Sequence, residues 1–385
     1  MISKRASLSL ALGLLAAAAI AATPGSARAQ FIGPLTSTEV GTTVPSNGDV
    51  NPYGVAIVPT TIGNLKAGHI LVSNFNDVGN AQGTGTTIVD IDPNNPATPA
   101  SVFATVTLGR GMRCPGGVGL TTALSVLKSG WVIVGSLPTT DGTIFTASPG
   151  CLIVLNAKGQ TVETFAGGDI NGPWDMTALD QGGVATLFVS NVLNGVLTTL
   201  PPSNDPEPVF PVVNKGTVAR LTLIVPPQGF GMPRLLASTI IGSGFSEQGS
   251  LAAVVVGPTG VGLGKDGTLY VADSAANRIA AIPDATTRFS TAFAGEDVSS
   301  NGLLNTPLGL AIAPNGDILT VNANDGNMVE TTPAGAQVAS NPTNYASNID
   351  DGAGALFGLA VQQVSATKTI VYFVDDIQNA LFVLK

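Results

Sequence analysis

Short runs of aliphatic and β-branched residues alternate with polar turns along most of this 385-residue chain, and helical periodicity is nearly absent. The pattern is clearest over residues 258–282. Residues 261–263 and 268–272 are β-prone runs, and Gly267 between them suits the positive φ of a tight hairpin. A polar turn then leads to a third run that begins at Arg278. Three such strands leave an exposed edge and bury too little apolar surface to be stable alone, so the unit must pack against neighbours.

Weaker copies of this unit recur on both sides of it. The Gly of its first strand recurs at Gly260, Gly309 and Gly358, with steps of 309 − 260 = 49 and 358 − 309 = 49 residues. Such regular spacing predicts a repeat architecture. We place the first strands of six units around Gly54, Gly117, Asp175, Gly260, Gly309 and Gly358.

The interval between the third and fourth units is the outlier, because their first strands are 260 − 175 = 85 residues apart. This insertion, 200–256, holds a Pro-rich stretch at 200–211 and a Gly-rich, apolar run at 226–249. We interpret both as surface loops or added strands on the third and fourth units. The alternative is a missed unit that begins at 235–241, a segment without the Gly and hairpin signature.

Residues 258–279 carry, in order, Pro-x-Gly, a hairpin, Tyr-Val-Ala-Asp and x-x-Asn-x-Arg-Ile, and this order resembles the NHL repeat. The resemblance implies an all-β, six-bladed β-propeller, because NHL repeats build propeller blades. A closed ring also removes the open edge that a stack of six sheets would leave. Gly suits the innermost strands, because side chains would collide where six strands converge on one axis.

The chain ends suggest how the ring closes. The last unit stops after three strands, at Lys385, so its sheet lacks an outer strand. The β-prone stretch 38–44 lies ahead of the first unit and is free to supply that strand. We therefore expect a ring closed by an N-terminal strand in the last blade.

Residues 1–29 have the features of a secretory signal peptide: basic residues at the start, an apolar stretch at 8–22 and Ala27-Arg28-Ala29 as a small-x-small cleavage site. Cleavage would leave 385 − 29 = 356 residues, 30–385, which fill one propeller domain. An uncleaved anchor is the alternative, but the apolar stretch is shorter than the ~20 residues of a spanning helix. No later segment is long enough to span a membrane, so we expect a periplasmic or secreted protein.

Charge argues against one class of partner. Loss of residues 1–29 leaves 16 − 3 = 13 basic residues against 25 acidic ones, a net charge of 13 − 25 = −12. Such a chain repels nucleic acid, and its few basic residues offer little material for an RNA-binding face.

Cys114 and Cys151 are the two cysteines of the chain. In an exported protein such a pair predicts a disulfide, and each residue is expected to precede a strand of the same blade at the same end. A thiol nucleophile or redox pair would instead need a neighbouring base or a close Cys-x-x-Cys spacing, and the sequence has neither.

Trp174 and Asp175 are the clearest departure from the repeat. They lie in NGPWDMTAL (171–179), at the start of an inner strand where the other units have Gly or a small residue. Both side chains would reach the mouth of the axial channel, with Asp175 as a metal ligand, a base or the partner of a buried Arg. The alternative is a satisfied carboxylate with Trp174 plugging the ring.

Arg110 and Arg113, ahead of the second unit, either offer a small anion or carboxylate site at the same rim or anchor their loop.

The same segment is similar to a motif of the SMP-30/gluconolactonase family, six-bladed propellers in which Pro-Asn-Asp contributes an Asn to a catalytic divalent metal. Pro173 and Asp175 match that motif, whereas Trp174 stands where the metal-binding Asn belongs. Glu39 is the one candidate for the metal-binding Glu that the family carries ahead of its first blade. The resemblance therefore implies the fold but leaves the metal ligands incomplete.

Polar residues recur at the ends of the second strands, namely Asn74, Asn191, Asp273, Asn322 and Asp375. A ring of such oxygens could suggest a calcium cage. A residue type repeated in nearly every blade instead favours one local task, capping the backbone N–H groups of the following turn. His69, the sole histidine, is predicted to be a half-buried strand residue, because it cannot alone supply the acid/base pair of the propeller lyases.

Together these features favour an exported NHL-like propeller that acts as a binding or scaffold module through loops on one rim, with an unknown protein or small molecule as its ligand. The alternative is a metal-dependent hydrolase of the SMP-30/gluconolactonase type, with its site at the mouth of the axial channel near Asp175. The binding module needs no cofactor, and a divalent metal such as calcium is compatible with it.

Overall fold

Six separate antiparallel sheets contain the named strands of the described residues, which are 30–385 without 34, 97–98, 344–355 and 366–367 in a computed structural model of the chain. The expected signal peptide lies outside the described residues. Within them, no helix is both long enough and apolar enough to cross a membrane.

The strands of each sheet follow one another in the sequence from the innermost strand outwards, except for the outermost strand of the sixth sheet. The first sheet contains β2 (Val50–Ile57), β3 (Ile70–Asn76), β4 (Thr87–Ile91) and β5 (Ser101–Thr105). The second contains β6 (Leu120–Val126), β7 (Val132–Ser136), β8 (Cys151–Leu155) and β9 (Thr161–Phe165). The third contains β10 (Gly172–Asp180), β11 (Val184–Val192), β12 (Val213–Ile224), β13 (Arg234–Ser250) and β14 (Val254–Val256).

The remaining three sheets repeat the arrangement. The fourth contains β15 (Pro258–Leu263), β16 (Leu269–Asp273), β17 (Arg278–Ile282) and β18 (Glu296–Ser300). The fifth contains β19 (Pro307–Ile312), β20 (Ile318–Asn322), β21 (Asn327–Thr331) and β22 (Gln337–Pro342). The sixth contains β23 (Leu356–Gln363), β24 (Thr369–Asp375), β25 (Ala380–Leu384) and, outermost, β1 (Ser37–Thr42).

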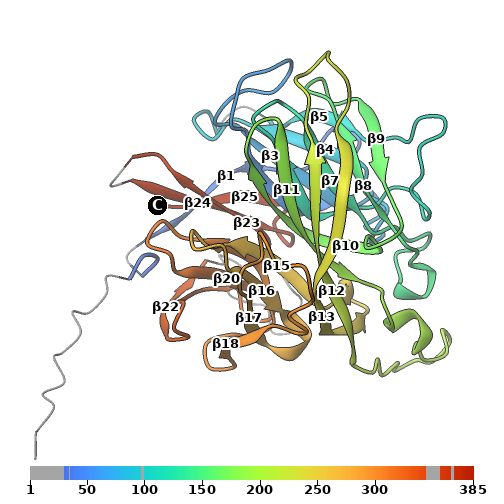
Figure 1. Cartoon of the computed structure of the whole chain (residues 1–385), viewed down its shortest axis with the longest axis vertical. Coiled ribbons are helices and arrows are strands. Elements are labelled where there is room, and N and C mark those ends of the chain that lie inside the picture. The colour runs from blue at the N-terminus through green and yellow to red at the C-terminus, as the bar shows by residue number, and fades with distance from the viewer. Residues whose placement is uncertain (1–29, 34, 97–98, 344–355, 366–367) are drawn as a thin grey trace, which may run out of the picture.

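The innermost strands surround one axis. Each contacts the next in the order β2, β6, β10, β15, β19 and β23, and β23 contacts β2. These contacts close a six-bladed β-propeller, which confirms the predicted fold class (Figure 1). Apolar side chains between blades form the core: one cluster joins Ile133 of the second sheet with Leu187 and Leu221 of the third. Each blade is thus stabilised by its neighbours.

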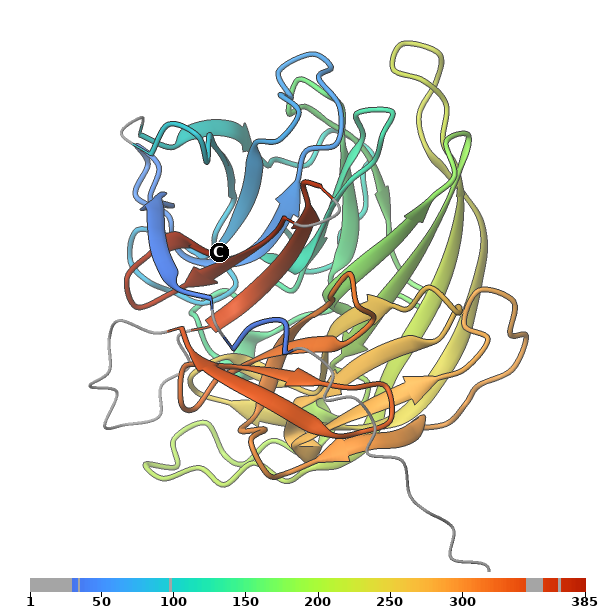
Figure 2. The same cartoon turned by 90° about the vertical axis from the view of Figure 1, so that its left-hand side faces the viewer.

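The N-terminal strand lies in the last sheet. β1 pairs antiparallel with β25, with Ser37 opposite Leu384 and Thr42 opposite Ala380. The C-terminus accordingly lies beside the blue N-terminal strand (Figure 2). Compared with the predicted stretch 38–44, β1 begins one residue earlier and ends two residues earlier.

The residues just ahead of β1 extend this closure to the fifth blade. The backbone N–H groups of Phe31 and Ile32 donate to Glu330 Oε2 at 2.7 and 3.0 Å, and Asn341 Nδ2 donates to the Ile32 carbonyl at 2.8 Å. The Ile32 side chain is fully buried in a cluster with residues of β20 and β24. The N-terminal segment therefore contacts the last two blades.

Crowding at the axis explains the recurring Gly of the inner strands. A Cβ added to Gly309 would lie 2.0 Å from the Phe357 carbonyl oxygen, and one added to Gly358 would lie 2.1 Å from that of Tyr53. Real Cβ atoms do not approach backbone oxygens so closely. At these Gly positions the inner strand thus approaches its neighbour more closely than a side chain allows, as the sequence predicts.

The prediction for the second blade was wrong by several residues. Its inner strand is β6, so Gly117 lies in the preceding loop, where its φ is +102°. Leu120 pairs with Ser136 as Pro52 pairs with Asn74, and Leu124 pairs with Val134 as Val55 pairs with Val72, so Thr122 and Ala123 occupy the place of Gly54. The inner strand of this blade has no Gly at that place, so the Gly of the loop misdirected the assignment.

The insertion adds strands to the third blade. Residues 235–241 lie in β13, which pairs with β12 as the fourth strand of that sheet, so the alternative of a missed blade is wrong. β13 then continues beyond the blade and forms a hairpin with β14. The segment 200–211 contains no strand.

Deletion of residues 31–44 should destabilise the whole ring, because it removes the outer strand of the sixth blade and the Ile32 contacts. Burial of Ile32 and Val40 alone is worth about 2 kcal/mol each. Thermal unfolding should therefore begin at a clearly lower temperature in the deletion variant than in a chain that starts at Gln30. An unchanged melting temperature would show that the ring does not depend on this segment.

Candidate functional site

The axis of the propeller is blocked at one end by stacked aromatic rings. We call this end the front face; it is the face at which the inner strands begin. The Tyr53 ring stacks on Phe357 and Trp174, with centroid distances of 3.9 and 5.8 Å, and Trp174 lies 6.1 Å from Phe357. The three rings come from the first, third and sixth blades. We call them the aromatic layer.

The hairpin formed by β13 and β14 covers this aromatic layer. Trp174 Nε1 donates to the Val255 carbonyl at 2.9 Å, and Val254 and Val255 belong to the same buried cluster as the three rings. Trp174 is only 3 % exposed. It therefore lies inside the ring as a plug, the alternative that the sequence left open, and does not reach an open channel mouth.

A cavity of about 420 Å³ lies on the other side of the aromatic layer, along the axis. Its walls are the later residues of the six inner strands, from Val55 of β2 to Val361 of β23. Each of these strands is the first in its sheet, so its inner edge has no strand partner. Those backbone N–H and C=O groups of these edges that have no side-chain partner are available to a ligand.

Asp175 lines this axial cavity next to the aromatic layer. Its Oδ1 accepts from the Met176 N–H at 2.7 Å, and its Oδ2 accepts from the Val261 N–H of the neighbouring blade at 3.2 Å. The residue is 8 % exposed, and burial raises its pKa to about 7 despite the two N–H donors. The buried Arg220 donates to the Ala285 carbonyl instead, so Asp175 is not its partner.

The metal centre of the SMP-30/gluconolactonase family does not fit these residues. An indole ring occupies the place of the metal-binding Asn, and its Nε1 donates to the Val255 carbonyl. Glu39 is exposed on β1, opposite Phe382 and at the outer edge of the sixth blade, so the sequence candidate for the Glu ligand is wrong. No group of three His, Cys, Asp or Glu side chains in the described part of the chain could hold a metal ion.

Arg110 and Arg113 lie apart from Trp174 and Asp175. Both are exposed in the loop between β5 and β6, and Arg113 lines a separate cavity of about 370 Å³ beside Glu163. The Arg113 backbone N–H donates to Thr164 Oγ1 at 3.0 Å, which fixes the loop on β9. The structure therefore favours the anchoring role of this loop over a site shared with Asp175.

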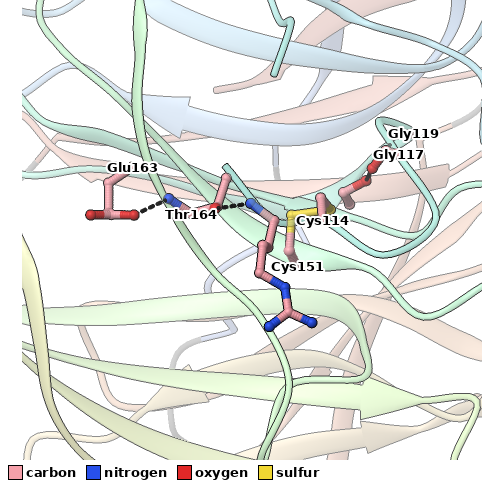
Figure 3. Close-up of a disulfide and its surroundings, with 8 residues drawn as sticks. Cys114, Gly117, Gly119, Cys151, Glu163 and Thr164 are labelled. Atoms are coloured by element: carbon pink, nitrogen blue, oxygen red, sulfur yellow. Dashed lines mark hydrogen bonds between the residues drawn. A yellow bond between two sulfur atoms is a disulfide. The ribbon is translucent and has the colours of Figure 1, made fainter. Parts of the chain in front are cut away.

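The predicted disulfide is confirmed. Cys114 and Cys151 are bonded, with their Cα atoms 5.1 Å apart, beside Glu163 and Thr164 (Figure 3). Cys151 is the first residue of β8, and Cys114 lies in the loop ahead of β6. The bond therefore holds that loop against the second blade.

The polar residues that end the second strands are buried and serve structural contacts. Asn74 Nδ2 donates to the Thr43 carbonyl, Asn322 Nδ2 donates to the Leu303 carbonyl, and the Asn171 N–H donates to Asn191 Oδ1. These three bonds reach the loop that leads into the same blade. This differs from the predicted cap of the following turn, because the side chains point back towards the start of the inner strand.

The remaining two members of this set, Asp273 and Asp375, form local contacts. Asp273 Oδ2 pairs with Arg278 at 2.9 Å, and Asp375 Oδ1 accepts from the Gln378 N–H at 3.0 Å, the predicted type of cap. His69 is half-buried on the first blade, where its Nδ1 lies 2.9 Å from Asp90 Oδ1.

Sequence reasoning missed a second polar cavity, of about 430 Å³, at the front face between the first and sixth blades. Its lining includes Asn51, Asn76 and Gln82 from the first blade and Asp376 from the sixth. We call these four residues the seam cluster. No motif spacing reveals it, because closure of the ring brings together residues about 300 positions apart in the sequence.

Comparisons with known proteins give the fold and no family. No family model matches the chain, and no curated protein matches it in sequence. A gluconolactonase of Xanthomonas campestris has 13 % identity and a TM-score of 0.53 over 92 % of this chain and 90 % of its own. A luciferin-regenerating enzyme has 11 % identity and a TM-score of 0.52 over 91 % and 95 %. The PQQ-bound aldose sugar dehydrogenase of Streptomyces coelicolor has 14 % identity and a TM-score of 0.52 over 92 % and 99 %.

Asp175 should make the folded state less stable as the pH rises. Its pKa in the folded state is about 7, against about 3.9 in an unfolded chain. Between these two pKa values the folded state keeps a proton that the unfolded state releases. The resulting stabilisation of the folded state, at most about 4 kcal/mol, is therefore complete below about pH 4 and lost by about pH 7. The free energy of unfolding, measured with urea across this pH range, should fall less with rising pH in Asp175→Asn than in the wild type. Parallel curves for the two proteins would contradict the burial of a titrating carboxyl there.

Proposed function

We propose that the protein is an exported binding module that holds a small polar ligand in the axial cavity, against Asp175. The support is the placement of this carboxyl at the closed end of a cavity whose walls are the unpaired edges of six strands. A blind cavity limits the ligand to a small molecule or to the end of a longer one.

The chemistry of the walls indicates the ligand class. Strand edges offer both hydrogen-bond donors and acceptors, which suit hydroxyl and amide groups. Asp175 adds a carboxyl that takes a negative charge near neutral pH, and an amine or another donor next to it would favour the charged form. The expected ligand therefore carries hydroxyl or amide groups and one basic or strongly donating group.

This proposal moves the ligand from the rim loops to the axis. Of the rim candidates, Arg113 lines another cavity and Arg110 lies exposed in the same loop, whereas Asp175 lines the axial cavity. The front face is covered by the β13–β14 hairpin, so the ligand would enter from the opposite face, where the inner strands end.

Export is part of the same proposal. The signal-like residues 1–29 and the disulfide between Cys114 and Cys151 both suit an oxidising compartment, the periplasm or the exterior.

A hydrolase with its site in the same cavity is the second candidate. The observation that favours it is a carboxyl with a pKa of about 7, which suits general acid or base catalysis at neutral pH. The fold shared with a gluconolactonase is compatible with this candidate but carries no activity over at 13 % identity.

Binding of a panel of small amines and amino sugars to the purified protein tests the proposal. Ligand-observed NMR should identify binders whose affinity falls about 10- to 100-fold in Asp175→Asn, because a hydrogen bond to a charged group is lost. The control variant Asp284→Asn makes the same change of charge at an exposed position of the fourth blade, and it should bind like the wild type.

Equal binding by all three proteins would contradict a ligand at Asp175. Turnover of glucono-δ-lactone by the wild type that disappears in Asp175→Asn would instead establish the second candidate.

A further inference from the structure

The seam cluster exposes several side-chain oxygens to one cavity without satisfying them. Oδ1 of Asn51, Asn76 and Asp376 and Oε1 of Gln82 are buried and accept no hydrogen bond from any described residue. Asn51 and Asn76 are only 7 % and 2 % exposed, yet both line the cavity. Buried polar atoms nearly always have partners, so four orphaned acceptors in one cavity indicate a missing ligand.

Neighbouring hydrogen bonds determine which atom of two amides is left over. Asn76 Nδ2 donates to Asn80 Oδ1 at 2.7 Å, and Gln82 Nε2 donates to the Leu251 carbonyl at 2.8 Å. If either amide were turned over, an oxygen would face another oxygen, so these bonds hold the amide groups in their present orientation. Asn76 and Gln82 therefore direct oxygen, and not nitrogen, at the missing ligand.

In the described part of the chain, the cavity also lacks a basic side chain that could pair with a carboxylate. Its lining includes Asp376 and no Lys, Arg or His among the described residues.

We propose that the seam cluster is a calcium site, with Asn51, Asn76, Gln82 and Asp376 as its protein ligands. Three neutral amide oxygens and one carboxylate, completed by water, form the oxygen-only set that Ca²⁺ accepts in flexible geometry. Mg²⁺ suits the set less well, because it keeps its water and demands a strict octahedron. With one carboxylate the site should be weak, in the range of about 10⁻⁴ to 10⁻³ M typical of extracellular modules.

The position of the site gives the ion a structural effect. The Asn51 N–H donates to Asn379 Oδ1 at 2.7 Å, so the cluster spans the junction between the first and last blades. Leu251, the partner of Gln82, belongs to the hairpin loop that covers the aromatic layer. Calcium would therefore join both ends of the ring to that hairpin, independently of any ligand at Asp175.

Thermal unfolding of the full chain, stripped with a chelator, tests this inference. CaCl₂ from about 0.1 to 10 mM should raise the melting temperature, while NaCl of equal ionic strength should not and MgCl₂ should do so less. Asp376→Asn should weaken the apparent calcium affinity at least about tenfold, because it removes the only carboxylate ligand. Asp284→Asn, which loses an exposed carboxylate on the fourth blade, should respond like the wild type.

Two results would overturn the proposal: no calcium-dependent shift in the wild type, or equal shifts in Asp376→Asn and Asp284→Asn. Asn51→Asp provides a second test in case Asp376→Asn does not fold. This change adds a carboxylate to the cluster and should tighten calcium binding several-fold. Unchanged or weaker binding by Asn51→Asp would also refute the site.

Discussion

The exposed edge of a small sheet is the constraint from which this structure follows. Four short antiparallel strands do not bury enough apolar surface to be stable alone, and every further sheet in a linear stack would leave its outer face uncovered. A ring solves this problem, because each blade then has two neighbours and the last covers the first. Pairing of β1 with β25 places both ends of the chain in one sheet, so the ring cannot open without breaking a strand pairing.

Closure has a cost at the axis, where six strands converge. The inner strands of the later blades meet it with Gly309 and Gly358, whose neighbours leave no space for a Cβ. The third blade departs from this solution. There Trp174 joins the aromatic layer on one side, while Asp175 enters the cavity on the other. Trp174, together with Tyr53 and Phe357, thus closes the front face, and Asp175 places a buried carboxyl in the cavity behind it.

Features that follow from repeated residues or from residue type can be predicted from the sequence. Features that depend on closure of the ring cannot. The spacing of Gly260, Gly309 and Gly358 and the single pair of cysteines gave the blades and the disulfide. The second blade was misplaced because its inner strand has Thr122 and Ala123 in place of the Gly, and Gly117 of the preceding loop imitates the signal.

The site could be predicted only in part. Trp174 and Asp175 were found because they break the repeat, but their separation into plug and cavity depends on side-chain directions that no pattern encodes. The cover over Trp174 comes from a hairpin within a low-pattern insertion. The seam cluster joins Asn51 to Asp376 across the ring closure, so its residues carry no shared motif.

Native-state hydrogen exchange of β1 tests most directly whether the ring depends on closure by both chain ends. If the pairing with β25 is an integral part of the fold, the amide groups of β1 that bond to β25 should exchange as slowly as those between β24 and β25, through unfolding of the whole ring. Fast exchange throughout β1, with the rest of the sixth blade still protected, would contradict this account.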